Sequence, residues 1–142
     1  MTAVVDIGAN PIDTEPPYKW MLANRLCTLV GFEPQAVGLA KLNQRKGDLE
    51  TYLPYAVGDG RPGTLNLCLT PGMSSLLTPN KSVLSCFPIF SQFGTVTEQI
   101  PIETRTLDSI TEIDHIDLLK IDVQGSELAV FRNGRARLSE AV

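Results

Sequence analysis

The stretch at residues 4–10, Val-Val-Asp-Ile-Gly-Ala-Asn, constrains the fold more than any other part of the chain. Its β-branched residues predict a strand of residues 3–7 that is buried on both faces of a parallel sheet. Asp6 lies near the carboxyl end of that strand, and Gly8 lets the backbone bend close to a bound molecule. Open α/β sheets bind ligands outside the carboxyl ends of their strands. We therefore expect Gly8 and Asn10 to form the floor of a cofactor site, rather than only a tight turn.

A second apolar stretch, residues 29–32, ends in the same way at Glu33 and Pro34. Glu33 follows Gly8 by about 25 residues, close to the spacing at which nucleoside-binding βαβ units place the acid that binds a ribose. A carboxylate offers two acceptor oxygens to the two adjacent hydroxyls of a ribose. Glu33 is therefore a candidate ribose ligand. A solvated acid at a strand end is the alternative.

Asp6 helps to separate two classes of nucleoside cofactor. A carboxylate at this position would repel a pyrophosphate and would favour a cation. S-adenosylmethionine carries a sulfonium and an ammonium group and no phosphate. The sequence therefore favours S-adenosylmethionine over a nicotinamide dinucleotide.

The order of the expected elements indicates an α/β fold with a mostly parallel, doubly wound sheet. Strands are predicted at 3–7, 27–32, 51–57 and 116–123, and they alternate along the chain with helices predicted at 18–26, 34–46 and 128–132. Residues 64–69 alternate polar and apolar side chains, which predicts an antiparallel insertion after the third strand. A further strand at 97–105 contains Pro101, which favours an edge position. Residues 76–95 have no clean period and are expected to be a loop with a short helix.

Composition excludes several other classes of protein. The chain has 142 residues and a net charge of −4, which fits one domain and argues against a nucleic-acid partner. No apolar run reaches the roughly 18 residues that span a bilayer, so no membrane partner is expected. Cys27, Cys68 and Cys86 form no Cys-x-x-Cys pair. They are expected to be buried thiols in a cytoplasmic protein, and no metal site is expected.

Five motifs occur in an order and at spacings that resemble the FkbM-type S-adenosylmethionine-dependent methyltransferases. They are residues 6–10 (Asp-Ile-Gly-Ala-Asn), 31–34 (Gly-Phe-Glu-Pro), 56–59 (Ala-Val-Gly-Asp), 106–108 (Thr-Leu-Asp) and 119–127 (Leu-Lys-Ile-Asp-Val-Gln-Gly-Ser-Glu). The last motif is the most specific. The resemblance covers nearly the whole chain. It implies a Rossmann-like class I fold and methyl transfer, usually to a hydroxyl oxygen.

The resemblance also implies roles for individual residues in a site for S-adenosylmethionine. Four residues of the first motif would surround the methionine moiety, namely Asp6, Gly8, Ala9 and Asn10. Glu33, with Pro34 beside it, would hold the ribose. Ala56 and Val57 would flank the adenine.

Three residues of the last motif are candidates for catalysis. Asp122 ends the fourth strand and could deprotonate or orient an acceptor hydroxyl, helped by Glu127 at the start of the next helix. Lys120 lies two residues before Asp122 on the same face of the strand, so a structural ion pair between the two is the alternative. His115 precedes the strand, at the end away from ligands. A neighbouring pair of serines, Ser74 and Ser75, is more typical of a turn than of acceptor binding.

The expected reaction is in-line attack of an acceptor oxygen on the methyl carbon, which needs no metal. The acceptor is expected to be a small molecule or a sugar-like hydroxyl. A nucleotide-binding module without activity and, less favoured, an NAD-dependent dehydrogenase are the alternatives.

The chain departs from the family pattern in two ways. Residues 11–13 (Pro-Ile-Asp) stand where the family usually has a second glycine. Only strands 3, 2, 1 and 4 of the family's sheet are recognised, so we expect an incomplete domain that lacks strands 5–7. The outer edge of strand 116–123 would then be open to self-association.

Overall fold

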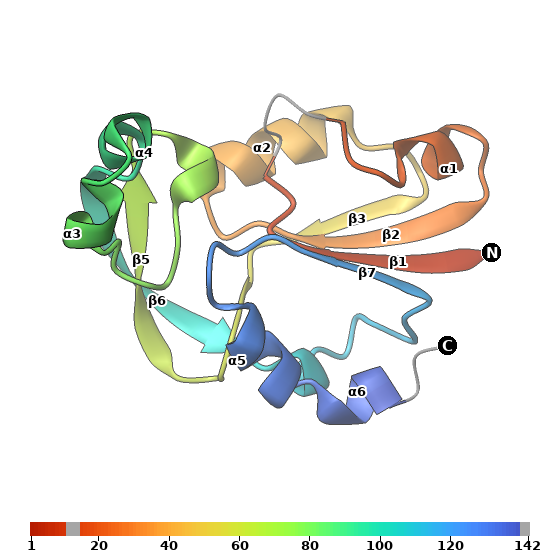
Figure 1. The fold of residues 1–142 in the computed structure, drawn as a ribbon. Coiled ribbons are helices and arrows are strands. Elements are labelled where there is room, and N and C mark those ends of the chain that lie inside the picture. The colour runs from red at the N-terminus through yellow and green to blue at the C-terminus, as the bar shows by residue number, and fades with distance from the viewer. Residues whose placement is uncertain (11–14, 140–142) are drawn as a thin grey trace.

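The computed structural model describes residues 1–10 and 15–139 and contains two sheets (Figure 1). The main sheet is parallel and has the order β3-β2-β1-β7, which confirms the predicted α/β fold with strand order 3-2-1-4. Its strands are β1 (Thr2–Ile7), β2 (Cys27–Phe32), β3 (Glu50–Leu53) and β7 (Leu118–Ile121).

The register of the main sheet brings the carboxyl ends of its strands to one edge. Ile7 pairs with Phe32 on one side and with Ile121 on the other, and Phe32 pairs with Leu53. The residues that follow β1, β2 and β7 therefore lie side by side. These residues include Gly8 and Glu33.

Helices cover both faces of the main sheet (Figure 1). One face carries α1 (Lys19–Ala23) and α2 (Ala36–Arg45), and the other carries η2 (Leu107–Ser109), α5 (Glu127–Arg132) and α6 (Arg135–Ser139). The larger core lies on the second face and contains Val5, Ile7, Phe32, Val57, Leu107, Ile110, Ile113, Ile116 and Val130. The smaller core lies under α1 and contains Val4, Tyr18, Cys27 and Leu29. Strand β1 therefore contributes to both cores through alternate residues.

The strand predicted at 51–57 is divided in the structure. Glu50–Leu53 belongs to the main sheet, whereas β4 (Ala56–Val57) pairs with β6 (Val96–Arg105) in the second sheet. Pro54 lies at the break. Because proline has no backbone N–H to donate, Pro54 weakens any sheet ladder at this point and favours the break. The division moves Ala56 and Val57 to the side of the site opposite the main sheet.

The second sheet has the order β4-β6-β5, and β5 (Pro62–Cys68) runs antiparallel to β6, as the alternation at 64–69 predicted. The sequence predicted an edge strand at 97–105. This prediction is wrong for the carboxyl end of β6, which pairs with both β4 and β5. It holds at Pro101, which pairs with Thr64 of β5, whereas β4 reaches only Thr104 and Arg105.

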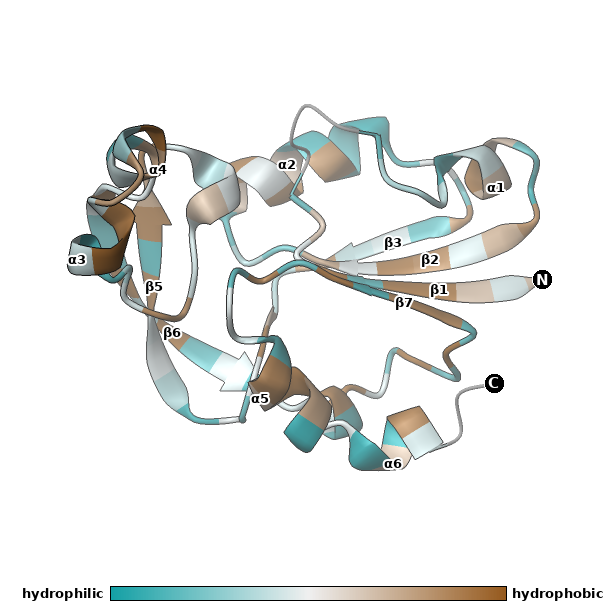
Figure 2. Ribbon diagram, in the orientation of Figure 1, coloured by the Kyte–Doolittle hydropathy of each residue, from teal (hydrophilic) through white to brown (hydrophobic). Residues whose placement is uncertain are grey.

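Residues 76–95 contain two short helices rather than one, α3 (Lys81–Leu84) and α4 (Pro88–Phe93), and they follow a 3-10 turn, η1 (Pro71–Met73). Asn80 caps α3, because its Oδ1 accepts hydrogen bonds from the N–H groups of Ser82 and Val83. Both α3 and α4 contain strongly apolar residues, drawn brown in Figure 2. Several of these side chains are exposed, which explains the lack of a clean period. They include Val83, Ile89, Phe90 and Phe93.

Several sequence predictions were right in kind but wrong in detail. The helix expected at 18–26 and the strand expected at 116–123 are both shorter in the structure. Cys27 and Cys68 are buried free thiols, as expected, whereas Cys86 is exposed. In the described part of the chain, no helix is long and apolar enough to span a membrane.

Candidate functional site

A cleft opens at the carboxyl edge of the main sheet, with an empty volume of about 610 Å³ that includes space open to solvent. One wall consists of the end of β1 and the segments that follow β1, β2 and β7, with Ile7, Gly8, Asn10, Glu33, Pro34, Gln35, Asp122, Val123 and Ser126. The facing wall contains Tyr55, Ala56, Val57, Leu65, Pro71, Gly72, Ser74, Ser75 and Leu76. The structure thus brings together seven of the predicted site residues, namely Gly8, Asn10, Glu33, Pro34, Ala56, Val57 and Asp122.

Glu33 is buried in this cleft, with a side chain that is 2% exposed. Its Oε1 accepts a hydrogen bond of 2.7 Å from the backbone N–H of Gln35. Burial raises the pKa of Glu33 to about 7, against the opposing effect of the Gln35 N–H, and the charge of Asp6 adds to the rise. The side chain packs against Gly38 of α2, where a Cβ would approach it to 3.1 Å. Glu33 is therefore a buried carboxyl that lines the cleft and accepts one backbone hydrogen bond.

Gly8 fixes the loop that follows β1. Its φ is +85°, and a Cβ at this position would lie 2.1 Å from the carbonyl oxygen of Asp122. The N–H groups of Gly8 and Ala9 both donate to the carbonyl oxygen of Phe32, at 3.1 and 3.0 Å. The loop is therefore held between β2 and β7, as a residue without a side chain permits.

Asp6 lies away from the cleft, on the side of the sheet that carries α1 and α2. The Tyr18 hydroxyl donates to its Oδ2, and Lys120 Nζ lies 2.9 Å from its Oδ1. Lys120 also donates to the carbonyl oxygen of Gly8 at 3.0 Å. Burial raises the pKa of Asp6, although Tyr18 and Lys120 oppose the rise. The structure therefore pairs Lys120 with Asp6, not with Asp122.

The groove that contains Asp6 and Lys120 also contains Ala9, which does not line the cleft. Asn10 and Asp122 line both spaces. The departure from the family pattern at residues 11–13 lies outside the described residues. The first motif therefore contributes Ile7, Gly8 and Asn10 to the cleft, but not Asp6 or Ala9.

Asp122 begins the turn that follows β7. Its N–H donates to the carbonyl oxygen of Ile7 at 2.9 Å, and its Oδ1 accepts from Gln124 Nε2 at 2.7 Å. The turn reverses through two residues with positive φ, Gln124 at +54° and Gly125 at +104°. Asp122 is half-buried at the cleft, which suits a carboxylate that takes a proton from a bound hydroxyl.

Glu127 supports this turn from the start of α5 and does not line the cleft. Its Oε1 accepts hydrogen bonds from the N–H groups of Val123 at 3.3 Å and Gly125 at 3.1 Å. Burial alone would raise the pKa of Glu127, but the backbone N–H groups outweigh it and the pKa is lowered. In the structure Glu127 therefore positions the turn and stays ionised.

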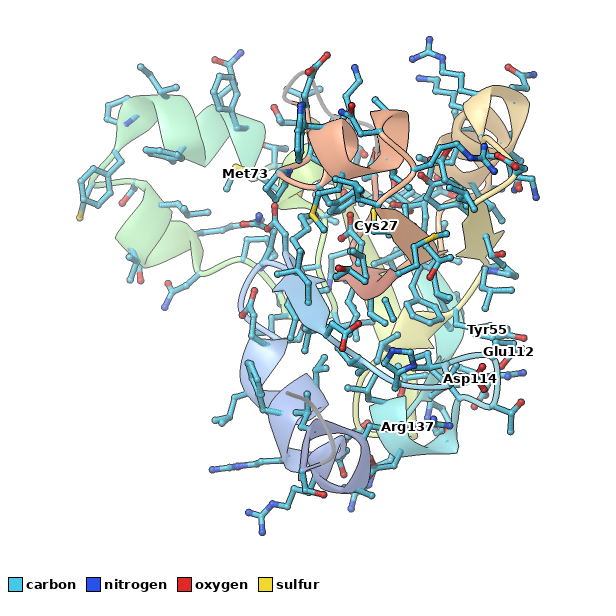
Figure 3. The ribbon with its side chains drawn as sticks, turned by 90° about the vertical axis from the view of Figure 1, so that its right-hand side faces the viewer. Cys27, Tyr55, Met73, Glu112, Asp114 and Arg137 are labelled. Carbon is cyan, nitrogen blue, oxygen red and sulfur yellow. The ribbon has the colours of Figure 1, made fainter. Side chains whose placement is uncertain are left out.

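Tyr55 is a residue of the cleft that the sequence analysis missed. Its ring stacks against Phe32 with centroids 6.2 Å apart, and the Arg105 guanidinium lies 3.7 Å from the ring centroid. Its hydroxyl donates to Glu112 Oε1 at 2.8 Å (Figure 3). An aromatic residue directly before Ala56 and Val57, the expected neighbours of adenine, was a usable signal.

The remaining candidates lie apart from the cleft. His115 Nε2 is 3.3 Å from Asp117 Oδ2 before β7, at the opposite end of the strand from Asp122, as expected. Across residues 1–10 and 15–139, no three His, Cys, Asp or Glu side chains form a group that could hold a metal ion.

The chain was also compared with known proteins. A model of the FkbM methyltransferase domain matches residues 6–141. No curated protein and no solved structure matches the chain. The family match covers nearly every residue, including all those that line the cleft. The chain therefore belongs to the FkbM methyltransferase domain family, whose general activity is methyl transfer.

Proposed function

We propose that the cleft binds S-adenosylmethionine and that the protein transfers its methyl group to a hydroxyl oxygen of a small-molecule or sugar-like acceptor. The observation that carries this proposal is Glu33, buried in the cleft beside the Gly8 loop. A buried carboxyl with a raised pKa gains most from a ligand that donates hydrogen bonds to it. The two hydroxyls of a ribose are such donors.

The cleft residues fit the other parts of this cofactor. Ala56, Val57 and Tyr55 form an apolar and aromatic wall that suits a purine ring. Gly8 and Asn10 also line the cleft and are the residues that would hold the methionine part. Glu33 and Asp122 line the cleft, and none of the described residues that line it is Lys, Arg or His. That charge balance supports a cationic ligand over a phosphate-bearing one.

Bound S-adenosylmethionine would supply an electrophilic methyl group on a cationic sulfur. Transfer of that group to a hydroxyl would require the hydroxyl proton of the acceptor to leave. Asp122 is our candidate to take it, because it is the carboxylate at the junction of the cleft and the neighbouring groove. Beyond this proton transfer, the protein contributes proximity and alignment.

Isothermal titration calorimetry with S-adenosylmethionine, S-adenosylhomocysteine and NAD tests the proposal. We expect the first two to bind and NAD to give no heat of binding. Glu33→Ala should weaken S-adenosylhomocysteine binding by roughly 1.5–3 kcal/mol, the range for a hydrogen bond to a charged group. Binding of NAD, or unchanged affinity in a folded Glu33→Ala variant, would contradict it.

Radioactive methyl transfer to a panel of hydroxyl compounds separates an enzyme from a binding module. Incorporation into a hydroxyl acceptor is the expected result. Tight binding of S-adenosylmethionine without transfer to any acceptor would favour the binding module.

A further inference from the structure

We infer that Ser75 is a positioning residue for Asp122, because its hydroxyl ties the facing wall of the cleft to the turn after β7. This inference deepens the proposed function, and its catalytic meaning rests on the role given there to Asp122. The contact itself stands on the geometry of three segments: β5, the residues after η1, and the turn at 122–125.

Ser75 makes its contacts from a buried position, with 5% of the residue exposed. Its Oγ lies 2.9 Å from the carbonyl oxygen of Gln124 and 3.3 Å from that of Val123. The same Oγ accepts from the N–H of Leu77 at 3.0 Å. A hydroxyl has one hydrogen to donate, and the shorter distance assigns it to Gln124.

The wall side of this contact is rigidly built. Ser75 exchanges two backbone hydrogen bonds with Asn66 of β5, of 2.8 and 3.1 Å. Asn66 is 1% exposed, and its Oδ1 accepts from Gln99 Nε2 at 2.7 Å. Ser75 is therefore anchored to the second sheet through its backbone, opposite a buried asparagine.

The turn side of the contact needs an anchor. Gln124 has φ +54°, in the left-handed region that is strained for a residue with a side chain. Its carbonyl oxygen is held by Ser75, and its side-chain amide donates to Asp122 Oδ1 at 2.7 Å. Glu127 holds the N–H groups of the turn from the opposite side.

A continuous chain of contacts thus runs Gln99–Asn66–Ser75–Gln124–Asp122. Gln124 engages Oδ1 of Asp122 and so constrains the orientation of this carboxylate. The wall that Ser75 belongs to lines the same cleft as Asp122. The position of this wall is therefore coupled to the orientation of the candidate base.

Side-chain order measured by NMR tests the inference on the full chain without any ligand. The readout is the ¹⁵N–{¹H} NOE of the Gln124 side-chain amide, assigned with Gln124→Glu. Asp122→Ala removes the acceptor of this amide and sets the value for a free side chain. We expect Ser75→Ala to lower the NOE by at least half of the difference between the wild type and Asp122→Ala.

Thr104→Val is the matched control. Thr104 is a buried residue of β6 whose hydroxyl donates to the carbonyl oxygen of Arg61 at 2.9 Å, and it makes no contact with the turn. Thr104→Val should lose stability and keep the wild-type NOE. Ser75→Thr keeps a hydroxyl and should also keep most of the NOE.

An unchanged NOE in Ser75→Ala would overturn the inference, and so would an equal loss in Ser75→Thr, since the hydroxyl would then not be the anchor. If Ser75→Ala does not fold, Ser75→Cys replaces it, because a thiol is a weaker donor of similar shape. For Ser75→Cys we expect a partial loss of the NOE. An unchanged NOE would refute the role of the Ser75 hydroxyl. Calorimetry with S-adenosylhomocysteine tests the proposed function separately, so the two failures are distinguishable.

Discussion

Replacing Glu33 by glutamine should make the unliganded protein more stable at alkaline pH and a poorer binder of its cofactor. The substitution keeps the shape of the side chain and an acceptor for the N–H of Gln35. It removes a negative charge that is buried without a full set of donors. At this position, the substitution that increases the stability of the unliganded protein should therefore weaken the binding of the cofactor.

The magnitude follows from the pKa of Glu33, which rises from an ordinary 4.5 to about 7 in the folded protein. A carboxyl with a raised pKa binds its proton more tightly in the folded state. Its contribution to stability is fully present below about pH 4.5 and is lost as the pH rises through about 7. At 1.36 kcal/mol per pKa unit, the ionised carboxylate costs about 3 kcal/mol at pH 8.

Urea unfolding of the wild type and of Glu33→Gln at pH 5 and pH 8 provides the assay. We expect the variant to have the larger free energy of unfolding by about 3 kcal/mol at pH 8 and by less than about 1 kcal/mol at pH 5. The control is Glu98→Gln, on the exposed part of β6. It should change the free energy of unfolding by no more than about 0.5 kcal/mol at either pH. The same Glu33→Gln protein should bind S-adenosylhomocysteine roughly tenfold to a hundredfold more weakly. A variant that is no more stable than the wild type at pH 8, or a difference that does not depend on pH, would refute the reasoning.

Four further predictions concern the loop, the buried ion pair, the candidate base and the sheet edge. Gly8→Ala should cost several kcal/mol in urea unfolding or prevent folding, because the positive φ and the carbonyl oxygen of Asp122 leave no room for a Cβ; a loss below about 1 kcal/mol would contradict this. Lys120→Met should cost about 3 kcal/mol at neutral pH and less in acid, where Asp6 takes up a proton and its uncompensated charge disappears; a cost that does not depend on pH would count against the pair. Asp122→Asn should leave S-adenosylhomocysteine binding largely intact and slow methyl transfer about a hundredfold or more, and near wild-type transfer would remove it as the base. Among the described residues, β7 pairs only with β1, so the chain should associate with increasing concentration in light scattering, and Leu118→Lys should reduce that association.

The sequence predicted the cleft residues best where the argument used only strand ends. Gly8, Glu33 and Asp122 each follow an apolar stretch, and parallel strands bring their carboxyl ends to one edge. Their convergence therefore needed the order of the strands and no knowledge of side-chain packing. The division of the third strand could also have been predicted, because Pro54 lies at the break.

The partners of the charged residues could not be predicted in the same way. Lys120 shares a face of β7 with Asp122, but the adjacent strand places Asp6 directly opposite Lys120. Periodicity along one strand says nothing about which side chains lie across the ladder. The hydroxyl of Tyr18 reaches Asp6 from a separate element for the same reason. The hydrogen bond from the Ser75 hydroxyl to the carbonyl oxygen of Gln124 joins residues 49 positions apart, which no local pattern encodes.

In the structure, the argument for a sulfonium cofactor over a dinucleotide rests on other residues than the argument from the sequence. The sequence argument used the charge of Asp6, yet Lys120 balances that charge on the far side of the sheet. The cleft itself contains two carboxyl groups, Glu33 and Asp122, and no cationic side chain among the described residues that line it. A pyrophosphate placed there would be repelled by the two carboxylates, whereas a sulfonium with an ammonium group would be attracted. The preference for S-adenosylmethionine is therefore better supported by the lining of the cleft than by the residue that first suggested it.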